Sequence, residues 1–116
     1  MSEELHITSA QNPRIKDAAA LRDRKEREQR QRILVEGARE IGRAIASGWR
    51  VESAFVCREL LSDAAQALLR TLASDRGVTS VSAHVFDKLA VRDGSDGLAV
   101  ILHTRTYQQR YWLGIR

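Results

Sequence analysis

The sequence predicts a single α/β domain folded as a three-layer α/β/α sandwich. Its 116 residues suffice to bury one hydrophobic core. Hydrophobic residues make up 43% and charged residues 29% of the chain, which is typical of a folded globular protein and excludes disorder as its main state. Segments with a helical period alternate along the chain with short β-favouring runs, and this alternation predicts a sheet between two layers of helices.

The first expected helix begins at the Asn-Pro pair at 12–13, because proline fixes its own φ near the helical value. Ile15, Ala18 and Leu21 then share one face at helical spacing. Arg22 interrupts this apolar stripe. We therefore expect the helix to leave the core near that turn.

The later elements continue the alternation. Apolar and β-branched runs predict strands at 33–35, 51–57, 78–81 and 98–103, the first of them a buried strand. A helix is expected after each of the first three strands. Ser62 and Ser82 are the expected N-caps of the second and third of these helices, while Gly48 and Gly77 are expected to end the first and second.

A basic segment from Arg14 to Arg32 accounts for the net charge of the chain. It holds eight basic and four acidic side chains, a net charge of +4, and the whole chain is also +4. Six of the eight are arginines, whose planar guanidinium suits bidentate contact with phosphate. The segment therefore indicates RNA binding that weakens as salt rises. A solvated helix face with internal salt bridges is the alternative interpretation.

Few residues suggest a catalytic or metal centre. The three histidines lack the spacing of zinc ligands, and the single cysteine, Cys57, lies in an apolar run that favours a packing role. The Gly94-x-x-Gly97 pattern favours a turn. Gly37 followed by a helix favours a plain strand-to-helix turn, although the start of that helix would also present free amides able to hold one phosphate. No apolar stretch approaches the length of a membrane span, so we expect a soluble, cytoplasmic protein with no metal or cofactor in this chain.

A set of spaced motifs resembles a known family. The order Ile7-x-Ser9-x-x-Asn12-x-x-Ile15-Lys16, a basic run with Arg27, then Leu34-Val35-Glu36-Gly37-x-Arg39-x-Ile41, is similar to the N-terminal substrate-binding domain of SpoU (TrmH-type) RNA 2′-O-ribose methyltransferases. The resemblance covers residues 5 to 102. It implies a fold like that of the ribosomal kink-turn-binding proteins, and a domain that holds ribosomal or transfer RNA. Methyl transfer from S-adenosylmethionine is implied for a separate catalytic (SPOUT) domain, through which such proteins form homodimers.

The resemblance also assigns site residues. Asn12, Lys16 and Arg27 match the family pattern and are expected to contact RNA, while Glu36 and Gly37 are expected to shape the turn beside it. Six further residues are added on charge alone: Arg14, Arg22, Arg24, Lys25, Arg30 and Arg32.

The chain is expected to divide into an RNA substrate-binding domain at 1–102 and a tail or linker at 103–116 that leads toward an absent catalytic domain. Without that domain the chain should not methylate RNA. Two alternatives remain from the sequence: a stand-alone RNA-binding protein of the ribosomal kink-turn type, and a protein-interaction adaptor whose basic helix is only a soluble face.

Overall fold

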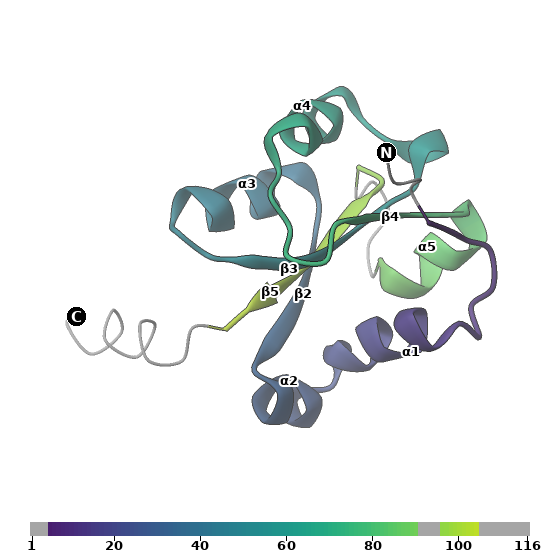
Figure 1. The fold of residues 1–116 in the computed structure, drawn as a ribbon, viewed down its shortest axis with the longest axis vertical. Helices are drawn as coiled ribbons and strands as arrows, with labels where there is room; N and C mark the ends of the chain where they lie inside the picture. The colour runs from purple at the N-terminus through teal and green to yellow at the C-terminus, as the bar shows by residue number, and fades with distance from the viewer. Residues whose placement is uncertain (1–4, 91–95, 105–116) are drawn as a thin grey trace.

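A five-stranded sheet forms the middle layer of the protein (Figure 1). The computed structural model describes residues 5–90 and 96–104. The strands lie in the order β1-β4-β3-β5-β2. β1, β4 and β3 are parallel, whereas β5 is antiparallel to both β3 and β2. Their bounds are His6–Ile7 for β1, Arg32–Glu36 for β2, Val51–Val56 for β3, Val78–Val81 for β4 and Leu98–His103 for β5.

Helices cover both faces of this sheet, which confirms the predicted three-layer arrangement. α3 and α4 lie on one side of the strands in Figure 1, and α1, α2 and α5 lie on the other. The helices span Pro13–Ala19 (α1), Arg24–Arg30 (α2), Ala38–Ala46 (α3), Asp63–Thr71 (α4) and Ala83–Leu89 (α5), with short 3₁₀ turns at Ala20–Arg22 (η1) and Arg58–Leu60 (η2).

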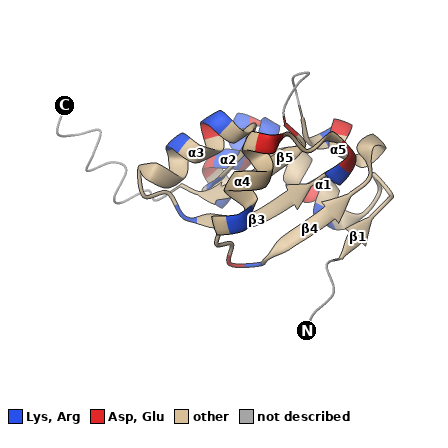
Figure 2. Ribbon diagram, turned by 90° about the horizontal axis from the view of Figure 1, so that it is seen from above, with Lys and Arg blue, Asp and Glu red and all other residues tan. Residues whose placement is uncertain are grey.

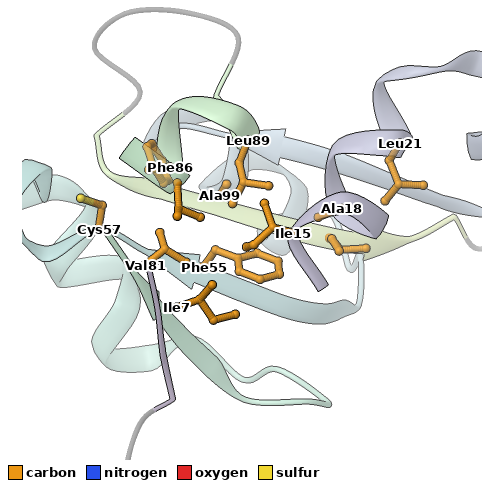
Figure 3. Packing of buried hydrophobic residues seen from close by; sticks show 12 residues of the cluster. Ile7, Ile15, Ala18, Leu21, Phe55, Cys57, Val81, Phe86, Leu89 and Ala99 are labelled. Atoms are coloured by element: carbon orange, nitrogen blue, oxygen red, sulfur yellow. The ribbon is translucent and has the colours of Figure 1, made fainter. Parts of the chain in front are cut away.

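Two apolar clusters, one on each face, hold the layers together. On the first face Phe55 of β3 and Val81 of β4 pack with Ile15 of α1 and Phe86 of α5 (Figure 3). On the second face Ile41 of α3 packs with apolar side chains of β3, β5 and α4. β5 alternates its side chains between the two clusters from Leu98 to Leu102, as the pleat of a sheet requires.

β2 is an edge strand, which corrects the expectation that 33–35 is fully buried. Among the described strands it pairs only with β5, and all five of its residues are half-buried. Ile33 and Val35 pack against the α3 face, and Leu34 packs against the α1 face. An edge strand has a neighbour on one side only, so its residues keep contact with solvent.

Two further features differ from the sequence-based expectation. α4 ends at Thr71, before Gly77, because Leu72 turns to an extended conformation and packs on the second cluster. Gly77, with φ of 79°, instead lies in the turn that enters β4. β1 was not expected, because two residues are too few to show a strand pattern. Within 5–90 and 96–104, no helix has the length and apolar character needed to cross a bilayer.

Candidate nucleic-acid interface

Asn12 starts α1, as the sequence predicts. Its side-chain Oδ1 accepts a hydrogen bond from the Arg14 amide at 2.9 Å, and Pro13 occupies the first helical position. The Arg14 guanidinium lies 5.7 Å from the centre of the Phe55 ring, a cation–π contact. Burial, and then the nearby charge of Arg76, lower the pKa of Arg14. The environment of Arg14 is therefore positive and only partly hydrated.

The basic run forms a separate helix rather than an extension of α1. Asp23 takes an extended conformation and caps α2 by accepting a hydrogen bond from the Lys25 amide at 3.0 Å. Gln31, with φ of 54°, ends the helix in the left-handed region and passes the chain into β2. No residue of α2 is buried. Apolar packing therefore contributes little to holding this helix in place.

Arginine side chains fix α2 by donating to main-chain carbonyls. Arg27 donates to the carbonyl oxygens of Leu21 at 3.0 Å and Arg22 at 2.6 Å, and Arg30 donates to that of Asp17 at 2.8 Å. Carbonyls at the end of a helix lack intrahelical partners and carry partial negative charge. A guanidinium there donates the missing hydrogen bonds and supplies the opposite charge. These bonds fold α2 back against η1 and the end of α1.

Arg22 and Arg32 tie the same unit to the rest of the domain. Arg22 donates to the carbonyl oxygens of Lys88 and Ala90, at the end of α5. Arg32 forms an ion pair with Glu52 of β3 at 2.7 Å, in which both side chains are half-buried. Both arginines therefore have structural partners far from them in the sequence.

Three of the predicted basic residues point charge into solvent. Lys16 and Lys25 are exposed, and their ammonium groups form no hydrogen bond or ion pair with another described residue. Arg24 pairs with Glu28 at 3.0 Å, but both side chains are largely exposed, at 82% and 66%. Such a pair is weak and screened by salt. These three side chains are the part of the predicted set that a phosphate can reach most readily.

The turn between β2 and α3 is closed by a carboxylate. Gly37, with φ of 94°, supplies no side-chain cap, and Asp96 accepts a hydrogen bond from the Ala38 amide through Oδ2 at 2.8 Å. The expectation of free amides after Gly37 that could hold a phosphate is therefore wrong for Ala38. Glu36, the other residue assigned to this turn, is half-buried at the end of β2.

Gly97 fixes the position of Asp96. Its φ is 72°, and a Cβ there would lie 2.8 Å from three main-chain atoms, of Cys57, Leu60 and Leu61. Only glycine fits this approach. The first part of the Gly94-x-x-Gly97 pattern lies outside the described residues.

α3 carries two exposed arginines that the sequence analysis did not assign to the site. Arg39 and Arg43 are one turn apart, and their guanidinium groups form no hydrogen bond or ion pair with another described residue. Ile41, on the inner side of the same helix, is fully buried. The signal was present in the sequence, because arginines four residues apart beside an apolar stripe predict an exposed basic face.

No metal-binding cluster accompanies these cations in the described ranges. No group of three or more His, Cys, Asp or Glu side chains lies close enough there to hold a metal ion. Cys57 is buried, and burial raises the pKa of its thiol, so it is a packing residue rather than a nucleophile.

Comparison with known proteins assigns the chain to a family of substrate-binding domains. A family model described as the MRM3-like substrate binding domain matches residues 12–100. No match was found among curated proteins. A solved structure described as an RNA 2′-O ribose methyltransferase is 40% identical, with a TM-score of 0.79 over 86% of this chain and 38% of that chain.

Two other solved structures have the same fold. The AdoMet-bound rRNA methyltransferase from Sinorhizobium meliloti is 25% identical, with a TM-score of 0.66 over 86% of this chain and 36% of that one. The SpoU methyltransferase AviRb from Streptomyces viridochromogenes, in complex with the cofactor AdoMet, is 24% identical, with a TM-score of 0.71 over 80% of this chain and 36% of that one. The chain thus spans less than two fifths of the length of each.

Proposed function

Because the chain belongs to the family of MRM3-like substrate binding domains, we propose that it binds the RNA substrate of an S-adenosylmethionine-dependent RNA 2′-O-ribose methyltransferase. The observation that carries this proposal is the 40% identity to an RNA 2′-O ribose methyltransferase, over 86% of this chain. The exposed cations of α1 and α2 supply the chemistry, because binding to RNA begins with neutralising phosphates.

Methyl transfer belongs, in this proposal, to another part of the full protein. Two relatives bind AdoMet, and most of their length lies outside the similarity. The described residues suit that cofactor poorly, since apolar clusters fill both sheet faces and Asp96 already binds the Ala38 amide where an anionic group would approach α3. When bound, AdoMet supplies the methyl group, and the present chain contributes binding and orientation of the RNA.

Within the predicted site, the residues take two roles. Lys16, Arg24 and Lys25 contact phosphates, because their charges face solvent. A second group supports that surface by fixing α1, α2 and the turn after β2, and consists of Asn12, Arg14, Arg22, Arg27, Arg30, Arg32, Glu36 and Gly37. We further propose ribosomal or transfer RNA as the target, a homodimeric full-length protein and a cytoplasmic location.

Fluorescence anisotropy with a labelled ribosomal RNA hairpin tests the function. We expect binding at low salt. The logarithm of the binding constant should fall linearly with the logarithm of the salt concentration between about 50 and 200 mM. The Lys16→Gln/Lys25→Gln variant should bind more weakly, with a salt dependence shallower by about 0.7 to 0.9 for each phosphate that the variant no longer neutralises. No binding of any structured RNA by the wild-type chain at the lowest salt would refute the proposal.

The choice of residues matters for this test. Charge reversal at Arg27 or Arg30 would remove bonds to Leu21, Arg22 and Asp17 and place an acid beside their carbonyls. Loss of binding would then report loss of structure.

Isothermal titration with S-adenosylmethionine tests the division of roles, and we expect no heat of binding to this chain. A clear titration would contradict it.

A further inference from the structure

The strand between α2 and α3 leaves main-chain groups open at the edge of the sheet. The Gly37 amide donates to the Leu98 carbonyl, and the Thr104 amide donates to the Gln31 carbonyl. In an antiparallel pair the residues that bond to the partner alternate with residues that do not. Odd-numbered residues of β2 therefore bond to β5. The amide and carbonyl of Arg32 and Leu34 point away from β5, toward the open edge.

The two helices that contact β2, one on each face of the sheet, both carry exposed cations. Arg39 and Arg43 project from α3 on one face, and Arg24 and Lys25 from α2 on the other. Figure 2 shows Lys and Arg bands on both α2 and α3, and Figure 1 places these two helices on opposite sides of the sheet. The continuous segment 24–46 holds seven basic and four acidic side chains, a net charge of +3. This edge is therefore basic as well as rich in hydrogen-bonding groups.

We propose that the RNA backbone crosses the sheet edge at β2, with Arg39 and Arg43 binding phosphates on one side of the strand and Arg24 and Lys25 on the other. This inference rests on the proposed function and adds to it the path of the RNA. β2 is about 16 Å long at the usual rise of a strand, so several nucleotides can lie along it.

The exposed main chain of β2 also favours RNA over DNA. Its free edge presents amide donors and carbonyl acceptors in alternation. A ribose 2′-hydroxyl both donates and accepts hydrogen bonds, so it can pair with either group, whereas a deoxyribose offers neither. A carboxylate only accepts hydrogen bonds, so acidic side chains alone would satisfy the arginines and the amides but not the carbonyls.

The Arg39→Gln/Arg43→Gln variant tests the path. Both side chains are exposed and form no hydrogen bond or ion pair with another described residue, so the unfolding midpoint of the variant in urea should match the wild type. We expect about 10- to 100-fold weaker binding of the RNA hairpin at low salt. The slope of log K against log salt concentration should be shallower by about 1.4 to 1.8.

The matched control is Arg70→Gln/Lys88→Gln, which removes two exposed charges from α4 and α5. We expect less than about a threefold loss of affinity for this control, because screening weakens charges far from the bound phosphates. Equal losses for the two double variants would show a non-specific charge effect and overturn the path. A second comparison uses a DNA hairpin of the same sequence, which the wild type should bind more weakly than RNA at equal salt.

The outcomes separate the two proposals. If the wild type binds RNA and the Arg39→Gln/Arg43→Gln variant has unchanged affinity and salt dependence, the path across β2 is wrong while the RNA-binding function stands. Equal binding of RNA and DNA hairpins refutes the role of the β2 main chain. If the wild type binds no RNA, the proposed function itself fails.

Discussion

α2 and α3 flank the same strand, but different forces hold them in place. α2 has no buried residue, and Arg27 and Arg30 fix it by donating to carbonyls of the preceding turns. α3 buries Ile41 against the sheet, and the guanidinium groups of Arg39 and Arg43 form no hydrogen bond or ion pair with another described residue. The difference teaches that a helix with an apolar anchor leaves its arginines available for a ligand.

The comparison changes how the charge of the basic segment is interpreted. Between Arg14 and Arg32 the sequence shows a net charge of +4, yet much of it serves the fold. Arg22, Arg27 and Arg30 donate to carbonyls, and Arg32 pairs with Glu52. These guanidinium groups remain positive and add to the field around α2. Their geometry, however, is set by the protein and not by a phosphate.

The largest expected effect is the loss of the anchor of α3. Replacing Ile41 with alanine should lower the free energy of unfolding by about 3 kcal/mol, because it leaves a cavity in the second apolar cluster. Urea denaturation measures this loss. Arg43→Ala on the same helix is the control and should change stability by less than about 0.5 kcal/mol. Similar losses for the two variants would show that α3 is not held by apolar packing.

A smaller effect is expected for the anchor of α2. Replacing Arg27 with alanine should cost about 1 to 2 kcal/mol, because the carbonyls of Leu21 and Arg22 lose their donor. Lys25→Ala, on the same helix, removes a charge without a partner among the described residues and should cost less than about 0.5 kcal/mol. The same denaturation experiment distinguishes them. If Lys25→Ala is the more destabilising change, the anchoring role of Arg27 is wrong.

Much of the fold was predictable because its signals are local. Asn12, Ser62 and Ser82 each cap the helix that the sequence assigns to them. The apolar positions predicted for the first helix, Ile15, Ala18 and Leu21, all lie in the core. The resemblance to SpoU-type methyltransferases, which rests on short spaced motifs, is confirmed by the family match and by the 40% identical structure.

The role of each arginine was less predictable because its partners are remote in sequence. Arg22 and the Ala90 carbonyl are 68 residues apart, and Arg32 and Glu52 are 20 apart. Composition shows that a segment is basic, but only the fold shows which carbonyl lies within reach. The edge position of β2 depends in the same way on strand order, which no local pattern specifies. The separate start of α2 was readable in principle, since Asp23 is a good N-cap residue.

The smallest expected effect concerns the carboxylate that starts α3. Asp96 accepts a hydrogen bond from the Ala38 amide, a cap that Gly37 cannot supply. Glycine suits the φ of 69° at position 96 but lacks the carboxylate, so Asp96→Gly should lose only the cap, about 1 kcal/mol. Asparagine tolerates the same φ and keeps an acceptor oxygen, so Asp96→Asn should cost less than about 0.5 kcal/mol. Hydrogen exchange at the Ala38 amide should quicken in the glycine variant and change little in the asparagine variant. If both variants exchange at the wild-type rate, Asp96 does not hold the start of α3, and the orientation of Arg39 depends on the apolar anchor alone.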